Sequence, residues 1–317
     1  MNAVKPLDGR AVGLMVVLCA IWALQQIAIK AAAEQVAPVM QIGLRSGGAA
    51  LLVGLLLCVT RQGLPWRGGV WRLGLAVGGL FALEFMLVGE GMRYTSASHM
   101  VIFLYTAPIF AAIGLHLWAP AERLKPVQWL GVGLAFVGVV AAFAERAFAG
   151  LHGGGWAVLY GDALGVLGAV AWGATTVTVR CSRLVRLQAA QVLFYQLLAA
   201  FVLLGAVAAL TGQTAFEPDA RTWLSLGFQT LVVGFASFLA WFWLLRRYLA
   251  SRLGVLSFLT PWFGILMGWL LLDEPLEPGF MLGAGLVIAG IVTVTGSDVV
   301  AAMLARRAMA RQRNGVL

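Results

Sequence analysis

Long apolar runs separated by short polar connectors dominate the chain. Each run has about 20 mostly apolar residues, which is the length that a helix needs to cross a bilayer. The apolar residues are continuous rather than alternating, so the pattern predicts helices and argues against strands. The ten predicted spans are 11–30, 39–59, 71–91, 98–118, 127–145, 157–179, 188–210, 222–245, 254–272 and 280–297.

The composition of the chain supports a membrane protein. Of its 317 residues, 61% are hydrophobic and 11% are charged, whereas a soluble domain is about 45–50% apolar and about 25% charged. Such a chain lacks the polar side chains that would cover a surface in water. We therefore expect an all-α membrane protein with ten transmembrane helices, and not an ordinary soluble enzyme.

The basic connectors indicate the orientation in the membrane. Most of the 22 Lys and Arg residues lie on one predicted side, together with both ends of the chain. The positive-inside rule then places both termini, including the basic tail 298–317, in the cytoplasm. Orientation explains the net charge of +9 without nucleic-acid binding. No connector is long enough to form a folded domain, so we expect the function to reside among the helices.

The two halves of the chain resemble each other. The matching positions are Trp22, Lys30, Pro108, Glu122, Gly131, Gly133 and Gly138 in the first half, and Trp172, Arg180, Pro261, Glu274, Gly283, Gly285 and Gly290 in the second. Each copy is about five helices long, so the pattern predicts two five-helix repeats, 11–145 and 157–297, with the second inverted in the membrane. Inverted repeats are typical of secondary transporters; an old duplication without mechanistic consequence is the alternative.

These motifs resemble the EamA repeat of the drug/metabolite transporter superfamily. The stretches that carry the resemblance are 247–251, 260–261, 268–276 and 283–290, with 93–98, 107–108, 122 and 131–138 in the same order in the first half. The resemblance covers about residues 11 to 297. It implies a ten-helix exporter of small metabolites in the bacterial inner membrane, most like the bacterial aromatic amino acid exporters.

Two charged residues inside apolar runs are the sharpest candidates for substrate binding. Arg45 and Glu84 lie at matching predicted depths in the second and third spans. A charge inside the membrane is costly unless it is paired or hydrated. We expect the two side chains to share a polar cavity and to supply countercharges, with a structural ion pair as the alternative. Glu84 is also the candidate for proton coupling, whereas Glu90, nearer the outer end, is expected to be solvated.

Aromatic side chains at depth are candidates for contact with a flat, amphipathic substrate. Rings offer stacking surfaces, and a Trp face attracts an ammonium group. Trp22 and Gln25 lie on one side of the first span and form a polar-aromatic stripe. The full set of predicted ring and stripe residues is Trp22, Gln25, Tyr105, Trp172, Trp241, Phe258 and Trp262. Packing against other helices or against lipid is the alternative for each ring.

Two prolines within predicted spans are candidates for gating. Pro108 and Pro261 each remove a backbone donor and free the carbonyl four residues earlier, at Leu104 and Ser257. Symmetric kinks beside a central cavity would suit a conformational change, and a static packing kink is the alternative.

Three further polar residues have two interpretations each. His99 and His116, near the two ends of the fourth span, are expected to form interfacial hydrogen bonds, with a proton relay as the alternative. Asp162 is expected to cap the start of the sixth span, with cation binding as the alternative.

The motifs of several enzyme classes are absent from the sequence. It contains no phosphate-binding P-loop, no H-E-x-x-H zinc motif and no G-x-S-x-G elbow, so we expect neither an enzyme nor a bound cofactor or metal. The sequence predicts a transporter of a small amphipathic metabolite, most of all amino acids including aromatic ones. A multidrug or other-metabolite carrier, a passive channel and an intramembrane enzyme are the alternatives.

Overall fold

The computed structural model describes most of the predicted spans. It describes residues 8–64, 69–119, 125–151, 155–248, 256–257, 259–276, 278–279, 281–290 and 292–293. Glu122, Phe258 and the predicted cytoplasmic tail 298–317 lie outside the described residues.

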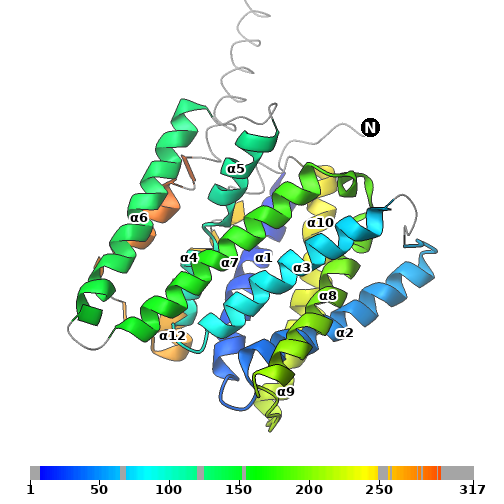
Figure 1. Ribbon diagram of the computed structural model, residues 1–317, viewed down its shortest axis with the longest axis horizontal. Coiled ribbons are helices and arrows are strands. Elements are labelled where there is room, and N and C mark those ends of the chain that lie inside the picture. The colour runs from blue at the N-terminus through cyan, green and yellow to red at the C-terminus, as the bar shows by residue number, and fades with distance from the viewer. Residues whose placement is uncertain are drawn as a thin grey trace, which may run out of the picture.

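The described part of the chain is helical (Figure 1). An isolated β-bridge joins Val36 and Phe216. The elements are α1 (Gly9–Ala31), α2 (Pro38–Val59), α3 (Val70–Gly91), α4 (Ala97–Leu104), α5 (Ala107–Trp118), α6 (Pro126–Leu151), α7 (Trp156–Arg180), η3 (Arg183–Arg186), α8 (Ala189–Leu210), α9 (Ala220–Gly227), η4 (Phe228–Ser237), α10 (Phe238–Arg247) and α12 (Leu259–Leu272). A further helix covers Met281–Gly290.

Membrane-spanning helices account for most of the predicted apolar runs. Within the described residues, seven stretches are long and apolar enough to cross a membrane. Three shorter apolar helices, Trp129–Gly138, Leu259–Leu272 and Met281–Gly290, lie in the other three predicted runs. An all-helical membrane protein is therefore confirmed, whereas the full count of ten spanning helices stays a prediction.

Two predicted spans depart from a single regular α-helix. The run at 98–118 divides into α4 and α5. The run at 222–245 is built from α9, the π-helix η4 and α10, which follow one another without a break. A π-helix of this length is rare, and π-helical turns occur frequently at functional sites.

Helices of the two sequence halves pack directly against each other at glycines. Figure 1 shows α3, α7 and α8 in the middle of the bundle, with α6 at one edge and α2 at the other. A Cβ atom at Gly78 of α3 would lie 2.8 Å from the Tyr195 carbonyl oxygen of α8, and one at Gly47 of α2 would lie 2.5 Å from the ring of Phe201. Small residues allow two helix backbones to approach this closely. Such packing stabilises the bundle because lipid offers no hydrophobic drive for helix association.

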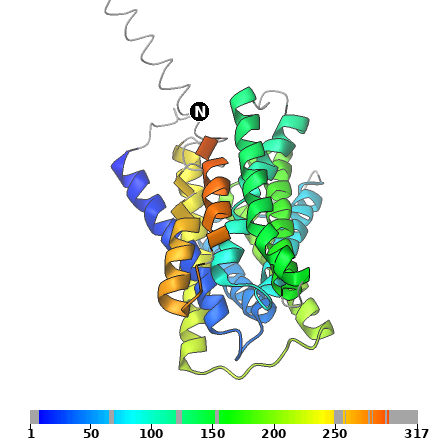
Figure 2. The same cartoon turned by 90° about the vertical axis from the view of Figure 1, so that its left-hand side faces the viewer.

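The long helices run along one common direction (Figure 2). In this view the connection 211–219 lies at one end of the bundle and the start of α1 at the other. We call the end that holds the connections 32–37, 92–96, 211–219 and 273–276 the outer end, because the charge pattern predicts it to face outward. Large apolar side chains such as Leu51 and Leu210 are exposed on the flanks, as expected for a surface in lipid.

Polar caps explain where several helices begin. Asp8 accepts a hydrogen bond from the Ala11 amide at the start of α1, and this bond lowers the pKa of the Asp8 carboxyl. Asp219 caps α9 in the same way through the amide and hydroxyl of Thr222, which lower the pKa of Asp219. These caps set helix starts within about two residues of the predicted ones.

Candidate functional site

Arg45 is a buried cation in the middle of α2. Its side chain is 2% exposed, and its guanidinium carbon lies 4.4 Å from the ring centroid of Phe85 on α3. Among the described residues, neither Nη1 nor Nη2 has a hydrogen-bond partner. A buried charge without partners is costly. The guanidinium therefore has two donors available for an anionic group that is not part of the described protein.

Glu84 lies on α3 directly before Phe85 and brings a carboxyl group near Arg45. Its side chain is 5% exposed, and the carboxyl group and the guanidinium interact electrostatically. Between these two described residues there is no ion pair within 4.0 Å. The structure thus brings the predicted pair into one region, but without the direct contact of a structural ion pair.

Tyr105 and Trp172 form an aromatic pair close to Glu84. Their ring centroids are 5.3 Å apart with an interplanar angle of 86°, an edge-to-face arrangement. Tyr105 is buried and interacts electrostatically with Glu84. Because Tyr105 follows α4 and Trp172 lies on α7, the pair joins the two halves of the sequence.

Trp22 and Trp241 form a second aromatic pair between α1 and α10. Their centroids are 5.5 Å apart at 79°, and the Trp22 indole donates a hydrogen bond of 3.1 Å to Ser237 Oγ at the end of η4. Phe81 connects this region with Arg45, because its ring contacts both Phe85 at 4.8 Å and Phe238 at 6.4 Å.

The buried and half-buried residues of this region make up what we call the central cluster. Several of its rings, among them Trp22, Phe85, Tyr105 and Trp172, also share one hydrophobic core. The members of the central cluster are Trp22, Arg45, Glu84, Phe85, Tyr105, Trp172 and Trp241. It combines a guanidinium and a carboxyl group with four rings that the sequence had singled out.

The remaining predicted site residues lie elsewhere or are not described. Gln25 is buried (4% exposed) on α1, three residues after Trp22. The Trp262 ring on α12 is 51% exposed, and its contact with substrate stays a prediction. Phe258 lies outside the described residues.

The helix break next to Tyr105 arises from Pro108. Tyr105 and Thr106 form a turn, and Pro108 is the second residue of α5. Thr106 Oγ1 donates a hydrogen bond of 2.6 Å to the Phe103 carbonyl. The predicted kink at Pro108 is therefore present as a full interruption, which places backbone groups beside the central cluster. Discontinuous helices of this kind are typical of binding sites in secondary transporters. Pro261 is buried in the first turn of α12.

A buried polar network near Arg45 was not predicted. Gln41 donates to the carbonyls of Ile29 (3.1 Å) and Val36 (2.8 Å), and Gln229 of η4 donates to Gln41 Oε1 at 2.9 Å. Gln41 precedes Arg45 by one helical turn, so both lie on one face of α2. That spacing is the signal that could have revealed the network.

Asp162 does not cap a helix, so the capping interpretation is wrong. The helix α7 begins earlier, at Trp156, because its apolar pattern extends further toward the N-terminus than the predicted boundary. Asp162 is fully buried and accepts a hydrogen bond from Thr95 Oγ1, and its Oδ2 lies 3.1 Å from His99 Nδ1. These residues connect α7 to the start of α4.

Comparison with known proteins identifies the family. The EamA-like transporter family matches residues 9–144 and again residues 159–296. The chain belongs to this family. It is therefore a membrane transporter of the drug/metabolite transporter superfamily, as the sequence motifs indicated.

Relatives and one solved structure agree with this assignment. "Uncharacterized transporter YoaV" of Bacillus subtilis is 25% identical over 86% of this chain and 91% of its own. "Probable amino-acid metabolite efflux pump" of Salmonella typhimurium is 27% identical over 88% of this chain and 92% of its own. "Uncharacterized inner membrane transporter YedA" of Escherichia coli K12 is 25% identical over 89% and 90%. A crystal structure with 20% identity covers 90% of this chain and 96% of its own with a TM-score of 0.62, so it shares the fold.

Proposed function

We propose that this transporter exports small amphipathic metabolites, namely amino acids including aromatic ones, across the bacterial inner membrane by alternating access. The observation that carries the proposal is the buried Arg45 guanidinium, whose Nη1 and Nη2 lack partners among the described residues. A substrate carboxylate would satisfy both donors in a bidentate pair. The relatives named as amino-acid metabolite efflux pumps support this substrate class.

The central cluster suits a zwitterion with an apolar or aromatic side chain. Arg45 would bind the carboxylate, and Glu84, whose carboxyl group lies near Arg45, would bind the ammonium group. The Tyr105–Trp172 and Trp22–Trp241 pairs would contact the side chain of the substrate. The proposed substrate site comprises Trp22, Gln25, Arg45, Glu84, Tyr105, Trp172 and Trp241, and Phe258 and Trp262 stay candidates.

The proposal includes the predicted architecture. Ten spanning helices would form two inverted five-helix repeats, 11–145 and 157–297, with both termini in the cytoplasm. Two similar bundles of opposite orientation can exchange conformations, which opens the central cluster to one face and then to the other. The helix break at Pro108 and the proline at position 261 would be the pliable points.

Counterflow in liposomes tests the function. Purified protein should exchange labelled phenylalanine against unlabelled phenylalanine with saturable kinetics, and other aromatic amino acids should compete. Phenylalanine amide lacks the carboxylate and phenylpropionate lacks the ammonium group, so each should compete at least about tenfold more weakly, because one charged hydrogen bond contributes about 1.5–3 kcal/mol. Flux that does not saturate would indicate a channel, and a lack of competition by amino acids would contradict the substrate class.

Proton coupling through Glu84 gives a separate prediction. The variant Glu84→Gln keeps an oxygen that accepts a hydrogen bond from an ammonium group, but its amide takes up no proton at neutral pH. It should therefore lose accumulation driven by a proton gradient while it retains substrate exchange. Fluxes with and without an imposed pH gradient measure both properties. Unchanged accumulation would remove Glu84 from proton coupling.

A further inference from the structure

The connection between α3 and α4 is held at the outer end by a cation from α1. Lys30 Nζ donates hydrogen bonds to the carbonyl oxygens of Met92 (2.6 Å) and Thr95 (2.7 Å). Both carbonyls follow the end of α3, where the helix leaves acceptors without a partner in the helix itself. Lys30 therefore anchors this connection to α1.

An anion from the other half of the sequence holds the start of α4. Glu274 follows α12, and its Oε1 accepts a hydrogen bond from the Ala97 amide at 2.6 Å. Its Oε2 accepts from the Ser98 amide at 3.0 Å and from Ser98 Oγ at 2.5 Å. Ala97 and Ser98 are the first two residues of α4, whose amides lack partners within the helix and attract negative charge. One carboxylate thus receives three hydrogen bonds across the two halves.

The local backbone is shaped to bring Glu274 to this position. Asp273 adopts a left-handed conformation with φ of 53°, which is unfavourable for a residue with a Cβ. On α12, a Cβ atom at Gly268 would lie 2.1 Å from Ser98 Oγ and 2.4 Å from Glu274 Oε2. Only glycine leaves room for the carboxylate there. Strained turns of this kind persist where the surrounding structure requires them, often at functional sites.

The carboxylate also borders an open space. A cavity of about 370 Å³ at the outer end is lined by Lys30, Tyr94, Thr95, Ser96, Leu272 and Glu274. Glu274 is 8% exposed in this arrangement. If the carboxylate left the start of α4, the cavity would give it access to water.

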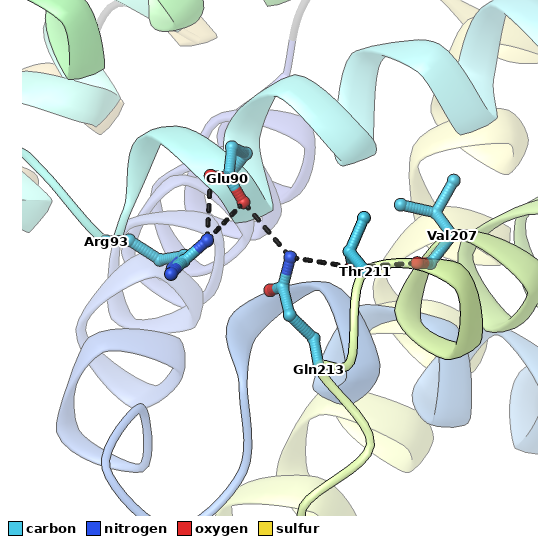
Figure 3. Close-up of polar contacts among 5 residues, drawn as sticks. All are labelled: Glu90, Arg93, Val207, Thr211 and Gln213. Atoms are coloured by element: carbon cyan, nitrogen blue, oxygen red, sulfur yellow. Dashed lines mark hydrogen bonds and ion pairs between the residues drawn. The ribbon is translucent and has the colours of Figure 1, made fainter.

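A second polar link at the outer end is much more exposed (Figure 3). Glu90 at the end of α3 pairs with Arg93 at 2.8 Å and accepts a hydrogen bond of 3.2 Å from Gln213, which follows α8. The Glu90 carboxylate raises the pKa of Arg93 through their hydrogen bond. The two paired side chains are 26% and 44% exposed, and exposed ion pairs contribute little. Glu90 is thus a suitable control for Glu274.

The position of α4 connects Glu274 with the central cluster. This helix has eight residues, so it is about 12 Å long. Its first residues bind Glu274, and it leads directly into Tyr105, which pairs with Trp172. Ser98 Oγ also lies 3.3 Å from the Gly264 carbonyl, so α4 and α12 are in close contact along this length. A single movement of α4 away from α12 would therefore both open the outer end and displace Tyr105.

We propose that Glu274 holds the outer end of the transport pathway closed, and that its release from the start of α4 opens the central cluster to the outside. The inference rests on the proposed alternating-access function. It assigns to Glu274 a positioning role, because the residue acts through α4 and not by contact with the substrate.

Cysteine accessibility tests the role of Glu274. Val101 is fully buried on α4 and faces Gly264 of α12, so Val101→Cys in a background without native cysteines reports separation of the two helices. The reporter is labelled with a membrane-impermeant maleimide that is added from outside. We expect Glu274→Gln to raise the rate of this labelling about tenfold. Glu90→Gln should leave the rate unchanged, and Ser98→Ala should raise it by a smaller factor. An unchanged rate in Glu274→Gln would overturn the proposal.

A second reporter separates gating from loss of folding. Leu193→Cys is equally buried and lies on α8, which packs mainly against α2 and α3, so it should stay unlabelled in Glu274→Gln. Equal gains at both reporters would mean general loosening and would also overturn the proposal. The labelling assay needs no substrate. If the labelling rate depends on Glu274 but amino acids show no counterflow, the proposed closure is supported and the proposed substrate class is rejected. If counterflow is saturable but the labelling rate does not depend on Glu274, the substrate class is supported and the closure is rejected.

Discussion

Arg45→Met is expected to reduce amino acid counterflow at least about 100-fold while the unfolding temperature stays the same or rises. The guanidinium is buried, and its Nη1 and Nη2 lack partners among the described residues. Its removal would therefore end a desolvation cost in the free protein. In the presence of substrate it would remove two charged hydrogen bonds to the carboxylate, about 3 kcal/mol or roughly 100-fold in affinity.

A lower unfolding temperature of Arg45→Met would instead indicate that Arg45 has a structural role. If Arg45 and Glu84 formed a structural ion pair, the loss of one partner would cost about 3–5 kcal/mol and lower the unfolding temperature. Thermal unfolding in detergent and counterflow in liposomes measure the two properties on the same preparation. Arg221→Met removes an exposed arginine at the start of α9 and serves as the matched control, for which we expect no loss of counterflow. Full transport by Arg45→Met would refute the substrate site.

Gly290→Ala is expected to destabilise the protein strongly, by about 3 kcal/mol. A Cβ atom at Gly290 would lie 2.4 Å from the Gly131 carbonyl oxygen and 2.5 Å from the Ala135 amide nitrogen of α6. Both are backbone atoms, so a side chain cannot rotate away to make room. The helix Met281–Gly290 would have to move away from α6 and lose its close packing.

Gly285→Ala on the same helix is the matched control. Apart from its own helix, a Cβ atom at Gly285 would meet no atom of the described residues within 4 Å. Alanine should be neutral there or stabilise the helix by up to about 1 kcal/mol, because it has the higher helix propensity. The yield of monodisperse protein and its unfolding temperature measure both variants. Equal stability of the two would show that the contact between α6 and the last helix yields easily.

The predicted spans agree with the helices where one apolar run forms one helix. The run 39–59 corresponds to α2 and the run 71–91 to α3, each within one residue at its start. The break at Tyr105 was foreseen in part, because Pro108 removes a backbone donor. The π-helix η4 could not be foreseen, because its side-chain composition is the same as that of an apolar α-helix.

The sequence named most members of the central cluster, but not their contacts or Phe85, and their role in binding stays a prediction. The positions of Arg45 and Glu84 along their predicted spans placed them at the same depth in the membrane, and the structure buries both in one region. The sequence could not show that Asp162 meets His99, or that Glu274 binds the start of α4. Each of these contacts joins residues far apart in the chain.

The sequence by itself determined that the protein lies in a membrane, which segments form its helices, and that its halves are related. These properties depend on the transfer of each segment into lipid and on local backbone hydrogen bonds, which adjacent residues decide. Only the tertiary structure decided which buried polar groups have partners. Glu274 receives three hydrogen bonds at the start of α4, whereas two donors of Arg45 have none among the described residues. This difference depends on how closely helices from distant parts of the chain approach one another and on how each helix is rotated about its axis. The order of residues within a single helix specifies neither the distance nor the rotation.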